Sequence, residues 1–194
     1  MEMSFEQKLE QQIRHIISNW KDEEIYAISF LVTTNELSTY RGICNFPEFS
    51  IGYNTESDCD NAEPLSEDRW NFACWCQNNI EIISAEHGDI SDELLNWYEE
   101  HCVVDIGVES EDNMYDYESF NYIGKGPNGY WELLCLISDI ARRIQTDGLI
   151  EKRFGRIPII VHDLDYSWYT AEMTKNANPN DEAKVFLEYL SSFN

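Results

Sequence analysis

The sequence predicts an α+β domain in which an N-terminal helix, a long central helix and a C-terminal helix pack against a mainly antiparallel sheet. Two observations predict this class. Amphipathic segments with helical periodicity alternate with apolar segments rich in β-branched and aromatic residues. The first strands are joined by connections too short for crossover helices, which favours antiparallel pairing. The 194 residues, 43% of them hydrophobic, suffice for one domain over 1–194 with its own core.

Five helices are predicted from the spacing of apolar residues, over 4–20, 91–101, 130–146, 167–176 and 180–191. Ser4 and Gln7 match the capping box, in which each side chain accepts a bond from the other residue's backbone N–H. We expect Ser91 to cap the second helix with its side chain. Asn178 followed by Pro179 is typical of an N-cap before the first helical residue, and it predicts the start of the last helix.

Strands are predicted where β-branched and aromatic residues concentrate, over 25–33, 40–46, 49–54 and 157–162. Pro47 marks a turn or an edge between two of them. Pro158 is expected to lie on an edge strand or at the start of the last strand, because proline lacks a backbone donor. The secondary structure of residues 70–83 is ambiguous from the sequence. The alternation of side chains over 70–76 favours a strand, which two asparagines interrupt and which 80–83 resume.

Charge is the most unusual property of the chain. It carries 37 Asp and Glu against 13 Lys and Arg, which gives a formal net charge of −24. Nucleic-acid phosphates and anionic membranes would be repelled, so we expect neither as a partner. No Lys or Arg occurs between Arg69 and Lys125. Such an interval would attract a basic protein partner, or it would simply be a solvated surface that keeps the protein soluble.

The candidate partner-binding residues are acids in predicted loops, namely Asp58, Asp60, Glu63, Glu109, Glu111, Asp112, Asp116 and Glu118. Aromatic side chains supply anchors at protein interfaces. Four of them lie among the acids, namely Trp97, Tyr98, Tyr115 and Tyr117. The sequence therefore favours an interface, and it leaves the oligomeric state open.

Two short motifs suggest other chemistry. Residues 124–129 match G-x-G-x-x-G before a helix, a pattern typical of dinucleotide binding. The segment before them is a weak strand, so a turn with a helix N-cap is favoured. Asp163 and Asp165 follow a predicted strand, where they would hold Mg²⁺ or act as an acid–base pair. The alternative is that they cap the following turn and helix, and it is favoured.

The six cysteines are expected to be free thiols, because the chain is long for a disulfide scaffold and shows no export signal. Cys44 and Cys135 lie in apolar segments and are expected in the core. Cys74 and Cys76 lack a second pair at zinc-ligand spacing. No nucleophile-elbow, zinc-protease or P-loop motif occurs. We therefore expect no catalytic residue, no cofactor and no metal.

The N-terminal residues lack the basic and apolar regions of a signal peptide, and no apolar run approaches the roughly 20 residues of a membrane span. The sequence therefore predicts a cytoplasmic protein.

Several segments together resemble a known family. In chain order they are EEIYAISFLV after the first helix, DRWNFACW, IPIIVHDLDYSW, and the ANP at 177–179. This arrangement resembles a bacterial family called domain of unknown function 4303, over nearly the whole chain. The resemblance implies an accessory or immunity protein encoded near secreted polymorphic toxins, and it implies no catalytic residue.

The leading hypothesis is therefore an acidic immunity or antitoxin-type protein that binds a basic toxin stoichiometrically and covers its active-site cleft, with a nuclease as the most plausible toxin. Two alternatives stay open. One is a metal- or ligand-dependent enzyme that uses the strand end at Asp163 and Asp165. The other is a regulatory interaction module without a toxin partner.

Overall fold

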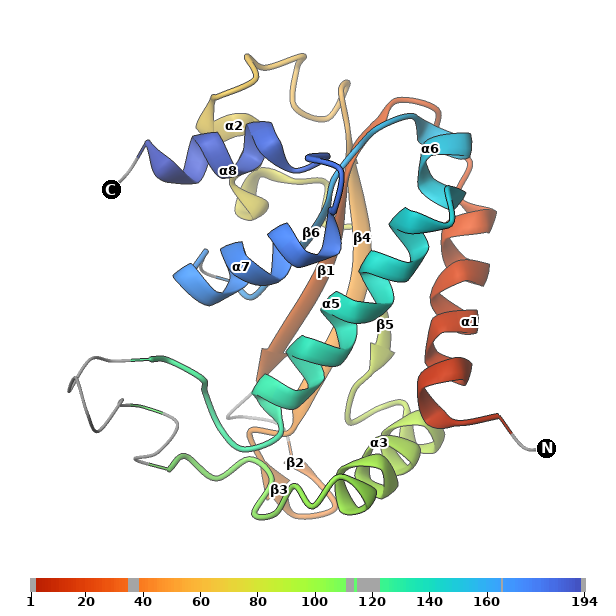
Figure 1. The fold of residues 1–194 in the computed structure, drawn as a ribbon, viewed down its shortest axis with the longest axis vertical. Helices are drawn as coiled ribbons and strands as arrows, with labels where there is room; N and C mark the ends of the chain where they lie inside the picture. Colours follow the sequence, from red (N-terminus) through yellow and green to blue (C-terminus); the bar gives the residue numbers. More distant parts are fainter. Residues whose placement is uncertain (1–2, 35–38, 111–113, 115–122, 165, 193–194) are drawn as a thin grey trace.

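The computed structural model describes residues 3–34, 39–110, 114, 123–164 and 166–192, and a four-stranded sheet lies at its centre (Figure 1). The strands are β1 (Ile25–Thr34), β4 (Pro47–Thr55), β5 (Ile80–Ile83) and β6 (Ile159–His162), in the order β5-β4-β1-β6. Two antiparallel pairings, β1–β4 and β4–β5, and one parallel pairing, β1–β6, hold the sheet together. The sheet is mixed and mainly antiparallel, and the α+β class is confirmed.

Helices cover both faces of this sheet (Figure 1). The first face carries α1 (Phe5–Asn19) and α5 (Tyr130–Thr146), and α3 (Gly88–Glu100) lies below them. The second face carries α2 (Glu67–Trp70), the 3₁₀ turn η1 (Phe72–Cys74) and α8 (Lys184–Ser191). The short α6 (Leu149–Phe154) follows α5, and α7 (Trp168–Ala177) packs against α5 and β6.

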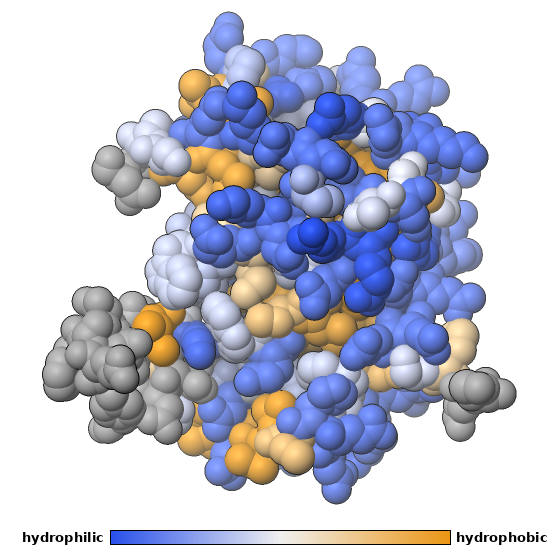
Figure 2. All heavy atoms as spheres, in the orientation of Figure 1, coloured by the Kyte–Doolittle hydropathy of each residue, from blue (hydrophilic) through white to orange (hydrophobic). Residues whose placement is uncertain are grey.

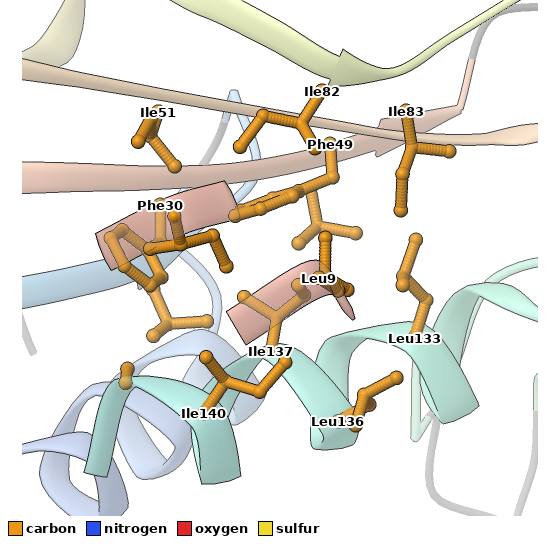
Figure 3. Close-up of a cluster of buried hydrophobic side chains, with 14 of the residues drawn as sticks. Leu9, Phe30, Phe49, Ile51, Ile82, Ile83, Leu133, Leu136, Ile137 and Ile140 are labelled. Atoms are coloured by element: carbon orange, nitrogen blue, oxygen red, sulfur yellow. The ribbon is translucent and has the colours of Figure 1, made fainter. Parts of the chain in front are cut away.

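The core consists of two apolar clusters, one on each face of the sheet. On the first face, Leu9 of α1 and Ile137 of α5 are buried with Phe30 of β1 (Figure 3). On the second face, Leu31 is buried with the aromatic side chains of α2, η1 and α8. Successive side chains of a strand point to opposite faces, so neighbours in β1 serve different clusters. This explains why eight consecutive residues of β1 are buried.

The N-terminal helix forms as predicted. Ser4 and Gln7 make both bonds of the capping box, and one face of α1 is buried. Pro47 is the first residue of β4, and Pro158 directly precedes β6, which lies at the sheet edge, so both positions predicted for Pro158 apply. The strand predicted over 40–46 is replaced by a small hairpin of β2 (Thr39–Tyr40) and β3 (Ile43–Cys44), because Arg41 and Gly42 turn the chain with positive φ.

The strand predicted over 70–76 is wrong. These residues form α2 and η1 instead, while β5 confirms the strand at 80–83. Trp70, Phe72 and Trp75 are all buried in the second cluster. α2 and η1 follow one another closely, so their turns point all three side chains toward the same face of the sheet. The apparent alternation therefore reflects the packing of two short helices.

Two predicted helix caps are also wrong. The second helix begins at Gly88 after His87, and Ser91 lies inside it, where its hydroxyl donates to the backbone oxygen of Ser84 at 2.8 Å. Asn178 ends α7 instead of starting α8, because its side chain forms two hydrogen bonds with the backbone of Ile159 in β6. Cys44 is exposed and Cys135 half-buried, so neither is a fully buried core residue.

The side chains of α7 cover the open edge of β6. Thr174 Oγ1 accepts from Val161 N and donates to Val161 O, both at 3.0 Å. Asn178 Oδ1 accepts from Ile159 N at 3.0 Å, and Asn178 Nδ2 donates to Ile159 O at 2.7 Å. Two side chains one helical turn apart thus satisfy the backbone groups that another strand would otherwise satisfy.

Across the described ranges, each helix is too short or too polar to cross a membrane.

Candidate functional site

Four of the acids predicted to bind a partner lie in the described residues, and they divide between two ends of the sheet. Asp58, Asp60 and Glu63 are exposed in the loop that follows β4. Glu109 is exposed near the β2–β3 hairpin at the opposite end, where Gly107 contacts Cys44 (Figure 1). The other four predicted residues lie outside the described residues, namely Glu111, Asp112, Asp116 and Glu118. The described acids therefore do not form one continuous patch.

A groove at the end of β4 collects four carboxylates. We call it the acidic groove and define it by Asp22, Glu23, Glu24 and Asp58, which line a cavity of about 420 Å³. The first three come from the short connection between α1 and β1, and Asp58 comes from the loop after β4. Antiparallel pairing of β1 with β4 brings the start of one strand beside the end of the other. Asp58 is the only residue of this set among the sequence-predicted acids.

Neutral hydroxyl groups hold three of these carboxylates. Asp22 accepts a short hydrogen bond from the Tyr53 hydroxyl. Ser57 donates to Glu24 Oε2 at 2.8 Å, and Thr55 donates to Asp58 Oδ2 at 2.6 Å. A hydroxyl donor orients a carboxylate without cancelling its charge. The groove therefore keeps its negative charges in fixed positions.

Arg69, which follows the same loop as Asp58, is engaged elsewhere. Arg69 binds both oxygens of Glu56 at 2.6 Å, and its guanidinium lies 4.0 Å from the ring centroid of Tyr26. The hydrogen bonds from Arg69 hold the pKa of Glu56 below its usual value. Within the described ranges, no Lys or Arg forms an ion pair with any of the four groove carboxylates.

The arginines of 142–156 do not neutralise the groove either. Arg143 pairs with Glu10 at 2.7 Å, and Arg142 donates to Asn176. Arg153 and Arg156 donate to backbone oxygens. The positive segment thus stabilises contacts between helices and loops and leaves the groove acidic.

The groove also changes the acidity of two neighbouring groups. Burial, and then the adjacent Asp22, raise the pKa of Tyr53 to about 12. Burial, followed by the charge of Asp58, raises the pKa of the Cys76 thiol. A thiol is strongly nucleophilic only as the thiolate, so this shift disfavours the reactive form of Cys76.

A second site lies where β1 and β6 end together. Asp163 Oδ2 accepts from the Tyr130 hydroxyl at 3.1 Å and from the Tyr169 hydroxyl at 2.7 Å. Gly126 of the glycine-rich segment lines the same cavity, whose volume is about 370 Å³. The structure thus brings together two motifs that lie far apart in the sequence. Asp165 lies outside the described residues.

The contacts of this second site are mainly structural. Burial raises the pKa of Tyr130, and burial is also the main cause that raises the pKa of Tyr169 to about 12, so both hydroxyls stay protonated donors. Glu132 accepts from Gly129 N at 3.1 Å, which supports a turn with a helix cap for the glycine-rich segment. Among the residues with defined positions, no three His, Cys, Asp or Glu side chains are arranged to hold a metal ion.

A buried serine–histidine pair lies beside the second site. Ser29 Oγ and His162 Nε2 are 2.8 Å apart, and His162 Nδ1 lies 2.6 Å from Asp163 O. Burial lowers the pKa of His162 to about 4, so the ring is neutral near pH 7. The pair has the spacing of a nucleophile and its base, but both side chains are fully buried. No substrate can reach them in this conformation, and the hydrogen bond between Ser29 and His162 satisfies two polar groups inside the core.

Of the aromatic residues predicted as anchors, Tyr98 is fully buried and donates to Gly129 O at 2.7 Å, so it belongs to the core. Trp97 is 9% exposed and packs against His101. Tyr115 and Tyr117 lie outside the described residues. Sequence reasoning missed Asp22, Glu23 and Glu24, although three consecutive acids between a helix and a strand were a visible signal.

No protein-family model, curated protein or solved structure matches this chain. The resemblance to the domain of unknown function 4303 family therefore stays a prediction.

Proposed function

We propose that this chain is a cytoplasmic, acidic, immunity-type protein that neutralises a basic toxin by stoichiometric binding. The acidic groove receives a basic segment of the toxin. If the toxin is a nuclease, the carboxylates occupy positions where nucleic-acid phosphates would otherwise bind. The protein performs no reaction in this scheme.

One observation carries the proposal. The four carboxylates of the acidic groove surround a cavity, are oriented by neutral hydroxyl groups, and form no ion pair with a Lys or Arg of the described residues. The chain carries arginines that could form ion pairs with these acids, yet the described arginines bind other groups. Unpaired charges held in place lower the reorganisation cost when a cationic partner arrives.

The test is binding to the product of the neighbouring gene. We expect a 1:1 complex that protects cells on co-expression, and an association rate that falls steeply as salt is raised. Replacing Asp22→Asn, Glu24→Gln and Asp58→Asn together should lower affinity about 10- to 100-fold, mainly through slower association. Absence of a complex at moderate salt would refute the proposal.

A charge-matched control separates a specific groove from a general acidic field. Glu86, Glu151 and Glu172 are exposed and lie outside the acidic groove. Their triple replacement by Gln removes the same number of charges and should change affinity less than about 3-fold, because distant exposed charges are screened. Equal losses in both triple variants would show that the groove is not the binding site.

The cavity at Asp163 supports a second candidate, the binding of a small polar ligand. The observation that favours it is the meeting of the glycine-rich segment, two tyrosine hydroxyls and a carboxylate in one cavity. Calorimetric titration with Mg²⁺ tests the metal-dependent form of this idea. Saturable heat that is lost in Asp163→Asn would support it, and the absence of any heat would eliminate it.

A further inference from the structure

A larger groove lies at the other end of α1, between α3 and α5. Its cavity volume is about 610 Å³. We call it the α3–α5 groove and define it by Trp97, His101, Trp131, Leu136 and Asp139, with Glu6 and Glu132 at its sides. Glu6 lies in the first turn of α1, whereas Asp22–Glu24 of the acidic groove follow the last turn. The two grooves are therefore separate surfaces.

Apolar and aromatic side chains form much of this groove. Trp97 stacks on His101 with ring centroids 4.2 Å apart. Trp131 is half-buried, and Val104 beside it is 66% exposed. Figure 2 shows hydrophobic surface over the middle of α5 and near the end of α3, on a face that is otherwise mostly hydrophilic. Apolar surface bordered by polar side chains is typical of a protein-binding site.

Negative charge lines the same groove. Glu6 accepts from Trp97 Nε1 at 3.2 Å, and Asp139 accepts from Asn176 Nδ2 at 3.1 Å. Both donors are neutral. Arg143 is the one Lys or Arg among the described lining residues, and it is already bound to Glu10 at 2.7 Å. Burial, and then the charges of Asp139 and Glu132, raise the pKa of Cys135 to about 11.

The shape of the groove follows the axis of α5. Trp131, Cys135 and Asp139 succeed one another at intervals of four residues, with Glu132 and Leu136 in the adjacent row. Residues four apart lie above one another on a helix, about 5–6 Å apart, so each row combines apolar and acidic positions. Such rows match a second helix that presents apolar residues flanked by cations.

Charge decides which occupant fits. A second copy of this chain would bring a net charge of −24 against acidic walls, and anionic lipids or nucleic acids would be repelled in the same way. We propose that the α3–α5 groove binds an amphipathic basic helix of a protein partner, with its apolar side chains on Trp131 and Val104 and its cations on Glu132 and Asp139. The inference rests on the proposed function only for the basic character of the partner.

Trp131 supplies the anchor in this arrangement. One face of its ring already lies near a cation, since Lys125 Nζ is 5.4 Å from the ring centroid. A bound arginine therefore displaces this lysine or stacks on the other face of the ring. Arginine stacks on aromatic faces and pairs with carboxylates through a planar fork, so arginine suits the groove better than lysine. We expect the bound helix to place an arginine between Trp131 and Asp139.

The experiment uses two synthetic 16-residue peptides of one composition, rich in leucine and arginine. One places leucine with helical periodicity, and the other is scrambled. We expect the patterned peptide to bind the full chain 1:1 in calorimetry, at least 10-fold more tightly than the scrambled one. Trp131→Ala should weaken binding at least 10-fold, and Asp139→Asn about 3-fold.

Controls make each outcome decisive. Trp168 is 55% exposed and lies outside the groove, so Trp168→Ala should leave binding unchanged. Thermal unfolding shows whether Trp131→Ala folds, and Asp139→Asn tests the groove independently of it. Equal binding of both peptides, full binding by Trp131→Ala, or a dimer that covers the groove would overturn the inference. Loss of binding only in the acidic-groove triple variant would also overturn it, while leaving the proposed function intact.

Discussion

Because Asn178 links α7 to β6, we predict that shortening its side chain destabilises the fold more than most other single substitutions. Its amide makes four hydrogen bonds at 5% exposure. Asn178 Oδ1 accepts from Ile159 N at 3.0 Å and from Gln145 Nε2 at 2.8 Å. Asn178 Nδ2 donates to Ile159 O and Thr174 O, both at 2.7 Å. This amide uses its whole bonding capacity.

Asn178→Ala would leave four buried polar groups without these partners. Each buried group that loses its partner costs about 1–3 kcal/mol, and partial relaxation makes the costs less than additive. We therefore expect the free energy of unfolding to fall by about 3–5 kcal/mol. Globular domains are stable by only about 5–15 kcal/mol, so the variant should be close to unfolding.

Urea unfolding, followed by circular dichroism and tryptophan fluorescence, measures this change. Asn96→Ala is the control, because Asn96 is exposed on α3 and should change stability by less than about 0.5 kcal/mol. Thr174→Val removes the other side-chain bridge to β6 and should cost about 1–3 kcal/mol. A loss below about 1 kcal/mol in Asn178→Ala would refute the view that this side chain supports the edge strand.

Three further predictions follow from other contacts. Burial keeps His162 neutral in the folded protein, whereas the unfolded chain binds a proton there below about pH 6.5. The free energy of unfolding should therefore fall by about 3 kcal/mol as the pH is lowered from 6.5 to 4. His162→Gln should remove this part of the pH dependence, as measured by urea unfolding. Gly107→Ala should lower the free energy of unfolding by about 3 kcal/mol or more, because an added Cβ would lie 1.9 Å from the backbone oxygen of Cys44. Gly148 has a similar φ but open space around it, so Gly148→Ala should cost only about 1 kcal/mol. Equal losses in urea denaturation would contradict this prediction. Arg69→Lys should lower the melting temperature by more than Arg41→Lys, because the Arg69 side chain is 14% exposed and binds Glu56 through two nitrogens, whereas the Arg41 side chain is 63% exposed. The opposite order would be inconsistent with these contacts.

Elements with a strong one-dimensional pattern could be predicted from the sequence. The bounds of α5 match the predicted 130–146, because its apolar residues repeat with helical spacing and most of them are buried. β1 was equally clear, because an apolar run that is rich in β-branched and aromatic residues and interrupted only by Ser29 is typical of a strand buried on both faces. The parallel pairing of β1 with β6 was not predictable from strand composition, since it depends on how the chain returns to the sheet.

The errors concern residues whose role depends on distant partners. The alternation around Trp70 and Phe72 resembled a strand, but packing on the second face of the sheet favoured two short helices. Asn178 has the local features of an N-cap, and its bonds to Ile159 outweigh them. Such bonds form only in the tertiary structure, so local propensity gives no signal for them.

The candidate sites show the same division. Negative charge was predicted from composition, whereas the acidic groove depends on the antiparallel pairing that sets Asp58 beside the α1–β1 connection. Likewise, Gly126 and Asp163 share a cavity only because β6 ends next to β1. Composition therefore indicated the sign of the surface charge, and only the fold located the cavities.

The pairing of Ile28 with Ile159 has a consequence for biosynthesis. β1 leaves the ribosome early, pairs with β4, and must then wait for nearly the whole remaining chain before β6 and α7 can cover its other flank. During that interval a long apolar strand is open to neighbouring nascent chains. A chain that stops short of β6 would keep this flank open permanently, so premature termination should yield aggregates or degraded fragments instead of a smaller functional protein.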